Sequence, residues 1–204
     1  AELDISASEG FWFPPDDWRS AYRPYKVTNG ILYVPVRGAL VNNMPWQFGA
    51  WATGYEYIRK AIERGLDDPD VKGILLNIES GGGMVSGNWD LVDYIASVRD
   101  VKPMRAVAND YAYSAAYNIA AATGPGNLTV SRTGGVGSIG VIITHFEYSK
   151  LLEKNGITVN IIRSKPGKAE GNGWETLSDA ARKRLQSDVD ELHEQFVNMV
   201  ATNR

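Results

Sequence analysis

The sequence predicts an α/β protein with a central, mostly parallel sheet flanked by helices. Short apolar runs typical of buried strands alternate along the chain with helical patterns, and glycine-rich turns follow several of the runs. Such alternation builds βαβ units, whose strands lie parallel. The predicted strands cover residues 31–37, 73–79, 104–108, 128–131, 139–144 and 157–162, and the predicted helices cover residues 55–64, 90–99, 115–122 and 148–154.

The two ends of the chain differ from this alternating region. Apolar residues recur at helical spacing from Leu185 to Val200, which predicts a long amphipathic helix whose stripe either packs in the core or contacts another subunit. Residues 1–26 are rich in aromatic residues and proline. They form either an arm that packs on a neighbouring subunit or an ordinary terminus. We therefore expect an N-terminal arm over residues 1–26 and a single domain over residues 27–204.

Composition limits the classes of function. The 204 residues are 44% hydrophobic, as in a soluble α/β domain, and 21 basic against 24 acidic residues give a net charge of −3. This charge offers no electrostatic case for nucleic-acid binding, and no apolar run approaches the roughly 20 residues of a membrane span. The chain has no cysteine, which excludes a disulfide framework. We expect no signal peptide, because the start of the chain is polar and acidic. We also expect an excised piece of a longer protein, because the chain begins with Ala1 instead of methionine and its helical pattern still runs at Arg204.

Ser114 is the first candidate for chemistry. It stands where the predicted strand 104–108 gives way to the alanine-rich predicted helix 115–122. A serine at such a junction exposes its hydroxyl, and the first N–H groups of a helix have no partner within the helix. One turn would therefore supply a nucleophile and half of an oxyanion hole. The alternative is that Ser114 serves only as a helix N-cap, a position that serine favours.

Two glycine-rich stretches, residues 80–87 and 133–140, lie on either side of Ser114 in the sequence. Consecutive glycines after a strand let the backbone approach a ligand and leave its N–H groups uncovered. Neither stretch matches a phosphate-binding loop or a dinucleotide-binding motif. Turns after successive parallel strands meet at the carboxyl edge of the sheet, so we expect one shared site there. Each stretch alone is equally compatible with a tight strand-to-helix connection.

The sequence alone does not decide which residue is the general base for Ser114. His193 lies among charges in the predicted C-terminal helix and is expected to be solvated, whereas His145 closes the predicted strand 139–144 and is the only histidine suited to a triad. Lys168 follows the predicted strand 157–162 in a glycine-rich loop. A lysine can act as a general base where burial removes water from its ammonium. A solvated surface charge is the alternative for any single lysine.

The order of these motifs resembles the signal peptide peptidase A family of serine proteases, which share the Clp protease and crotonase fold. Ser-Gly-Gly-Gly at 80–83 is followed by Tyr-Ser-Ala-Ala-Tyr-Asn at 113–118, by Ser-Arg-Thr-Gly-Gly-Val-Gly-Ser at 131–138 and by Ser-Lys-Pro-Gly-Lys at 164–168. The resemblance covers roughly residues 30–204 and is greatest to the phage and prophage branch, whose members are head maturation (capsid assembly) proteases.

The resemblance implies a Ser-Lys dyad with Ser114 as nucleophile and Lys168, rather than Lys165, as general base. The family's triad-type relatives carry their histidine where this chain has Val136, so His145 does not match. The absence of a histidine at this position is consistent with a lysine as the general base.

The resemblance also implies an oxyanion hole from the backbone N–H groups of Gly82 or Gly83 and of Ala115. Gly81 stands where the family usually has proline, which makes this turn less rigid. Ser138 resembles a serine that lines the family's site and is expected to orient the dyad. The simpler interpretation is that Ser138 only begins the predicted strand that follows it.

The implied reaction is peptide hydrolysis through an acyl-enzyme, with no cofactor and no metal. The implied substrates are capsid or scaffold proteins, and the implied assembly is a homo-oligomer. The implied setting is the bacterial cytosol or the phage-infected host cell, within proheads, with no nucleic-acid or membrane partner.

Two further hypotheses belong to other classes. A crotonase-like enzyme would use the same oxyanion hole on an acyl-thioester, with Asp110 or Glu79 as the nearest carboxylate bases. An assembly module that has lost catalysis would fold correctly and leave a serine-directed phosphonate unreacted.

Overall fold

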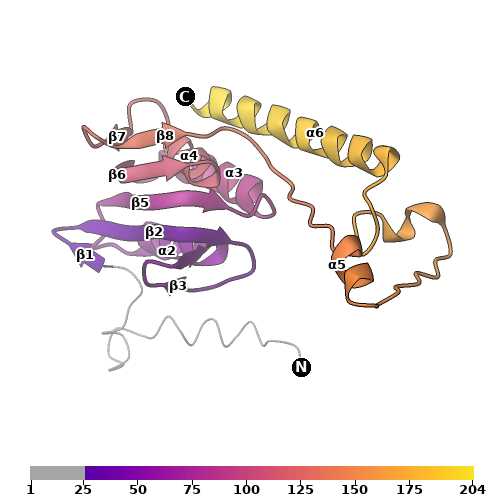
Figure 1. The fold of residues 1–204 in the computed structure, drawn as a ribbon. Helices are drawn as coiled ribbons and strands as arrows, with labels where there is room; N and C mark the ends of the chain where they lie inside the picture. Colours follow the sequence, from indigo (N-terminus) through magenta and orange to yellow (C-terminus); the bar gives the residue numbers. More distant parts are fainter. Residues whose placement is uncertain (1–25) are drawn as a thin grey trace. The chain divides into compact units, whose positions relative to one another are not determined.

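The computed structural model describes residues 26–204 (Figure 1). These residues divide into two compact units, one reaching to residue 139 and including residues 198–204, the other spanning residues 140–197. The predicted N-terminal arm lies, apart from Lys26, outside the described residues. The single domain expected over residues 27–204 stays a prediction.

The first unit is built on one eight-stranded sheet. Its order is β3-β4-β2-β5-β6-β7, with β1 antiparallel to β2 and β8 parallel to β6. The pairings β2–β4, β2–β5, β5–β6 and β6–β7 are parallel, and β3–β4 is antiparallel. The predicted α/β class with a mostly parallel sheet is confirmed. The strands are β1 (Lys26–Thr28), β2 (Ile31–Val41), β3 (Gln47–Phe48), β4 (Ala52–Gly54), β5 (Gly73–Gly83), β6 (Met104–Tyr113), β7 (Leu128–Val130) and β8 (Gly135–Gly137).

The core forms between one face of this sheet and three helices. These are α2 (Tyr55–Asp67), α3 (Asn88–Val98) and α4 (Ala115–Ala121), which lie together behind the sheet in Figure 1. Alternate strand residues such as Leu32, Val34 and Val36 are fully buried and join one apolar cluster with the helices. This burial of one strand face supplies most of the hydrophobic stabilisation of the unit.

Parallel pairing brings the ends of β5 and β6 to the same edge of the sheet. β5 runs through the predicted Ser-Gly-Gly-Gly turn to Gly83, and β6 ends at Tyr113, directly before Ser114. Because the two strands are parallel neighbours, both carboxyl ends point to the same side. The fold therefore places the glycine segment (residues 81–83) and the serine turn (residues 113–115) next to one another.

The second unit contains α5 (Ser149–Lys154), the 3₁₀ helix η2 (Pro166–Ala169) and most of α6 (Asp179–Asn203), which confirms the predicted long C-terminal helix. The strands predicted over residues 139–144 and 157–162 are wrong, since neither segment forms a strand. Their β-branched residues favour extended backbone, but a strand also needs a hydrogen-bonded neighbour. Within residues 26–204 neither segment has one, and the short strand β8 forms earlier, inside the second glycine-rich stretch.

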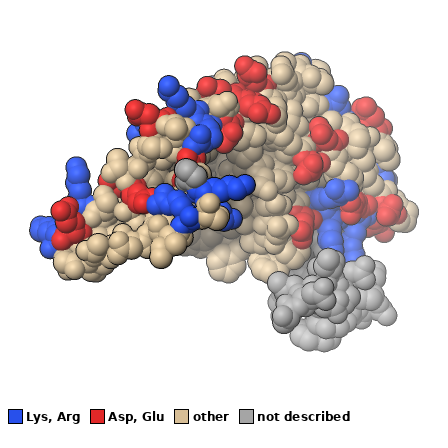
Figure 2. Space-filling model, turned by 90° about the vertical axis from the view of Figure 1, so that its right-hand side faces the viewer, with Lys and Arg blue, Asp and Glu red and all other residues tan. Residues whose placement is uncertain are grey.

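The surface carries both signs of charge. Figure 2 shows acidic and basic side chains interspersed on the face that it presents, as the small net charge of −3 leads one to expect. In the part of the chain that the structure describes, no helix is both long enough and apolar enough to cross a bilayer.

Candidate active site

The backbone at Ser114 is strained. Its φ of 52° and ψ of −127° lie in a region that residues other than glycine rarely adopt. Ser114 occupies the N-cap position of α4, yet its side chain makes no capping hydrogen bond. Its backbone N–H donates to the Gly137 carbonyl at 2.8 Å. The residue is half-buried, and capping does not account for its hydroxyl.

Gly82 packs directly against the serine turn. A β-carbon on Gly82 would lie 2.8 Å from Ser114 Cβ and 3.1 Å from the Ala115 nitrogen. Gly82 also has a φ of +102°, so this position requires glycine for both space and conformation. The structure thus brings together three of the residues singled out in the sequence: Gly82, Ser114 and Ala115.

Ser80 shapes the glycine segment from beneath, a role that sequence reasoning missed. Its buried hydroxyl donates to the Gly38 carbonyl at 2.6 Å and accepts the Gly82 N–H at 3.1 Å. The Gly82 N–H is therefore engaged here, whereas Gly83 is exposed. The one sequence signal for this anchor was the position of Ser80, directly after the predicted strand 73–79.

The second glycine-rich stretch also reaches the serine turn. β8 pairs with the end of β6, with Gly137 opposite Tyr113, and the Gly137 carbonyl accepts the Ser114 N–H. Ser138 follows immediately, is exposed and has a φ of 54°. All three glycine or serine turns thus lie at one edge of the sheet. A dyad-orienting role for Ser138 stays a prediction.

Lys168 belongs to the second unit. It lies exposed on η2, and its backbone N–H donates to the Lys165 carbonyl at 3.1 Å. Ser114 and Lys168 lie in different units, so their partnership stays a prediction.

Side chains around η2 hold the loop that carries Lys168. Asn172 donates from Nδ2 to the Ala169 carbonyl at 2.6 Å, and its Oδ1 accepts the backbone N–H groups of Trp174 and Glu175. Arg163 forms an ion pair with Glu175. The hydrogen bond from Arg163 holds the pKa of the Glu175 carboxyl below its usual value. The loop is therefore fixed by contacts inside its own unit.

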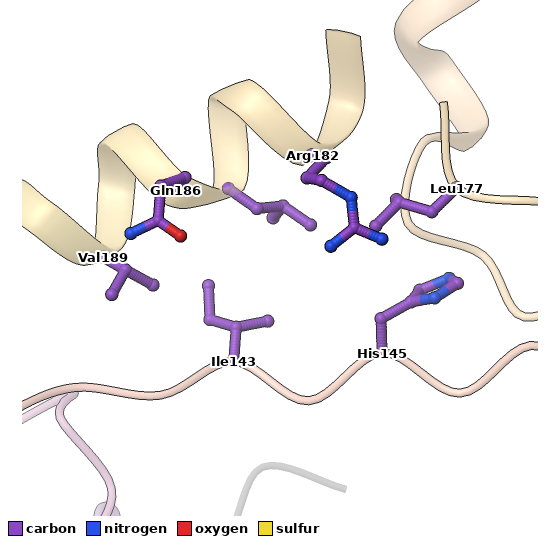
Figure 3. Close-up of a pocket in the computed structure, with 7 residues that line it drawn as sticks. Ile143, His145, Leu177, Arg182, Gln186 and Val189 are labelled. Atoms are coloured by element: carbon purple, nitrogen blue, oxygen red, sulfur yellow. The ribbon is translucent and has the colours of Figure 1, made fainter. Parts of the chain in front are cut away.

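Both histidines belong to the second unit. His193 is exposed on α6, as predicted. His145 hydrogen-bonds through Nε2 to the Asn172 carbonyl at 2.9 Å. It also lines a cavity of about 240 Å³ between residues 143–145 and α6, where Arg182 points toward the same space (Figure 3). His145 is thus a structural partner of the Lys168 loop.

The two carboxylates named as candidate bases for an acyl-thioester enzyme lie on strands of the sheet. Asp110 is exposed on β6, and Glu79 is half-buried on β5 with Arg37 opposite it on β2. Among residues 26–204 no group of three histidine, cysteine or acidic side chains is arranged to hold a metal ion.

Comparison with known proteins places this geometry in a family. The model of Peptidase family S49 matches residues 96–204. Capsid assembly protease C of Escherichia phage lambda is 40% identical over 91% of this chain and 42% of its own length. Head-tail preconnector protein GP5 of Enterobacteria phage P21 is 36% identical over 88% of this chain and 36% of its own length. The chain therefore spans less than half of either phage protein.

One of the matching solved structures has low sequence similarity to this chain. It is a protein assigned as an enoyl-CoA hydratase/isomerase from Acinetobacter baumannii, with a TM-score of 0.45 and 15% identity over 87% of this chain and 84% of that one. The family match and the lambda relative decide the assignment: the chain belongs to Peptidase family S49.

Proposed function

We propose that the chain is a serine endopeptidase in which Ser114 is the nucleophile and Lys168 the general base. The turn at Ser114 carries the proposal, because its backbone is strained and its hydroxyl makes no capping bond. Gly82 packs against this turn and, having no side chain, presents only backbone to it. A serine on a strained strand-to-helix turn is the arrangement that exposes a nucleophile in many hydrolases. Membership in a peptidase family supports the same reaction.

In this mechanism neutral Lys168 removes the proton from Ser114 Oγ, which attacks the carbonyl carbon of the scissile peptide bond. The Ala115 N–H and the Gly83 N–H stabilise the oxyanion, at about 3 kcal/mol for each such donor. The Gly82 N–H is held by Ser80 Oγ and supports the segment instead. Lys168 then gives the proton to the leaving amine, and water hydrolyses the acyl-enzyme. Ser138 supplies a hydroxyl that orients the dyad.

The exposure of Lys168 sets a condition on this mechanism. A lysine works as a general base only after its ammonium has lost water. Lys168 is exposed in the single chain, so bound substrate or a second copy of the chain must cover it during the reaction. A homo-oligomer is part of the proposal, since a second copy of the chain is one of these two ways to cover Lys168.

The biological role follows from the phage relatives. A capsid assembly protease and a head-tail preconnector protein are each more than a third identical to this chain. We propose that its substrates are capsid or scaffold proteins, cleaved during head maturation in the cytoplasm of the infected cell and within proheads.

The test compares Ser114→Ala and Lys168→Ala with two controls, Lys165→Ala from the same loop and His145→Ala. Cleavage of casein or scaffold protein is measured, together with covalent labelling by a serine-directed fluorophosphonate. We expect the first two variants to lose cleavage by at least about 1,000-fold, because a nucleophile and its base act as a unit. Both controls are expected to keep cleavage within a few-fold of wild type.

The other outcomes separate the alternatives. Loss of cleavage in His145→Ala with full activity in Lys168→Ala would assign the base to histidine. Turnover of an acyl-thioester that persists in Ser114→Ala would favour the crotonase-like enzyme. A folded wild type that neither cleaves nor labels would favour an assembly module.

A further inference from the structure

Two fully buried amides, Asn88 and Asn118, contact the first turn of α4. Asn88 Nδ2 donates to the Ala115 carbonyl at 3.1 Å, and Asn118 Nδ2 donates to Asn88 Oδ1 at 2.9 Å. A carbonyl can only accept, so Asn88 must turn its nitrogen to Ala115 and its oxygen to Asn118. Asn118 then has to donate. The orientation of both amides is therefore fixed by the backbone that they touch.

The same network reaches the glycine segment. The Tyr55 hydroxyl donates to the Met84 carbonyl at 2.5 Å and also hydrogen-bonds the Asn88 side chain. Met84 directly follows Gly83, and Asn88 is the first residue of α3, at the end of that segment. Tyr55 and Asn88 thus join the segment after β5 to the turn after β6 through side chains in the core.

This network is not what stability alone would select. Asn118 Oδ1 is one of the buried side-chain atoms without a hydrogen-bond partner within residues 26–204. The neighbours of Asn118 on α4 are the half-buried Tyr117, Ile119 and buried alanines, and its Nδ2 also lies 3.8 Å from Met199 Sδ. An unsatisfied buried carbonyl destabilises a core, whereas apolar side chains of the same shape at both positions would be close to neutral. The buried amides therefore point to a requirement for orientation.

We propose that Asn88 is a positioning residue for the reaction at Ser114. It holds the Ala115 carbonyl and, through the Ala115 Cα, the preceding peptide with the Ala115 N–H and the turn that carries Ser114, at a fixed place beside Gly82. Asn118 and Tyr55 fix the orientation of Asn88. The hydrogen bonds inside α4 cannot do this, because they do not connect α4 to the glycine segment. This inference rests on the proposed serine endopeptidase function.

The test uses Asn88→Ala, Asn88→Leu and the double variant Asn88→Leu/Asn118→Leu. The matched control is Asn127→Leu, because Asn127 Nδ2 also donates to a backbone carbonyl, that of Thr123 at 2.8 Å, beyond the far end of α4. For each variant we measure kcat and KM on a peptide substrate, the affinity for a peptide boronate that forms a tetrahedral adduct with the serine, and urea unfolding.

We expect the Asn88 variants to lose kcat by about 10- to 100-fold with KM within about 2-fold of wild type, since a displaced oxyanion donor acts mainly on the transition state. The boronate affinity should fall by the same factor as kcat. The double variant should unfold at a urea concentration close to that of wild type and still be slow, a combination that a merely structural role does not produce. Asn127→Leu should keep kcat and boronate affinity.

Ser114→Ala, measured in parallel, separates the two proposals. If Ser114→Ala is inactive and the Asn88 variants keep the kcat and boronate affinity of wild type, the positioning role is wrong and the proposed function stands. The positioning role is equally wrong if the loss of activity in the Asn88 variants equals the loss of folded protein that urea unfolding measures. It is also wrong if Asn127→Leu loses as much kcat as they do. If Ser114→Ala retains full cleavage, the proposed function fails, and the positioning role fails with it.

Discussion

Gly82 and Ser114 are in direct contact, since a β-carbon on Gly82 would approach Ser114 Cβ to 2.8 Å. β-carbons do not come this close in folded proteins without displacement of one of them. The contact joins the ends of β5 and β6 and leaves only backbone on the glycine side of the serine. Substitutions on this segment therefore test whether the contact serves the reaction.

The first prediction concerns Gly82→Ala. The added methyl group must push Ser114 or the Ala115 peptide aside, and alanine at a φ of +102° is strained as well. We expect cleavage to fall by about 100-fold or more, because even a small displacement of a nucleophile and its donors is expensive in rate. Steady-state kinetics on a peptide substrate measure this, with circular dichroism to establish that the variant folds.

Gly81→Ala is the matched control for that substitution. No atom lies within 4 Å of the β-carbon that Gly81 would gain, and its φ is not positive. We expect activity within about 2-fold of wild type, as for an unstrained surface substitution. Equal losses in Gly81→Ala and Gly82→Ala would show that the contact with Ser114 is not the cause.

The second prediction concerns Ser80→Ala. The substitution removes the hydroxyl that bridges the Gly38 carbonyl and the Gly82 N–H, and it leaves the buried Gly82 N–H and the half-buried Gly38 carbonyl without this partner. We expect a loss of about 1–3 kcal/mol in the free energy of unfolding and a lower kcat, because Gly82 loses its anchor. The control is Ser97→Ala, whose exposed hydroxyl bonds the Tyr94 carbonyl and should matter by less than about 0.5 kcal/mol. Urea unfolding of both variants tests this prediction, and equal losses in Ser80→Ala and Ser97→Ala would contradict it.

The central part of the fold could be predicted from the sequence because its strands are buried on one face. Residues 31–37, 73–79 and 104–108 read as apolar runs, and each is part of a longer strand in the sheet. The predicted helices over residues 55–64, 90–99 and 115–122 also exist, with small shifts at their ends. In each case the residue pattern reports burial in one compact core, which is a local consequence of composition.

The rest depends on partners that a residue pattern does not contain. Residues 139–144 and 157–162 have the composition of strands but no neighbouring strand, and β3 is too short, at two residues, to leave a periodic signal. Asn88 and Asn118 would ordinarily be placed on the surface, and only the alanine-rich surroundings of Asn118 hinted otherwise. The contact between Gly82 and Ser114 joins residues 32 positions apart, which requires the parallel register of β5 and β6.

The third prediction concerns the end of α6. Arg99 Nη1 donates to the Ala122 carbonyl at 3.1 Å and to Asn203 Oδ1 at 2.9 Å, so one guanidinium joins the ends of α4 and α6. We expect Arg99→Met to lower the free energy of unfolding by about 1–3 kcal/mol and Asn203→Ala by less, since Arg99 keeps its other acceptor. A double-mutant cycle should give a coupling of about 0.5–1.5 kcal/mol between the two residues. Purely additive losses would contradict the proposed link.

The fourth prediction concerns pH and the loop that carries Lys168. The hydrogen bond from Arg163 lowers the pKa of the Glu175 carboxyl from 4.5, so the folded state binds this proton more weakly than the unfolded chain. The ion pair therefore adds stability above about pH 4.5, and this contribution is lost as the pH falls through the lower pKa of the folded state. We expect wild type to be more stable than Glu175→Gln near neutral pH and the difference to shrink as the pH falls below 4.5, measured by urea unfolding across the range. Removing the main donor in Arg163→Met should reduce the difference, and the hydrogen bond that Asn172 Nδ2 donates to Glu175 at 3.2 Å should preserve the remainder. A difference of unchanged size in Arg163→Met would assign the shift to another group.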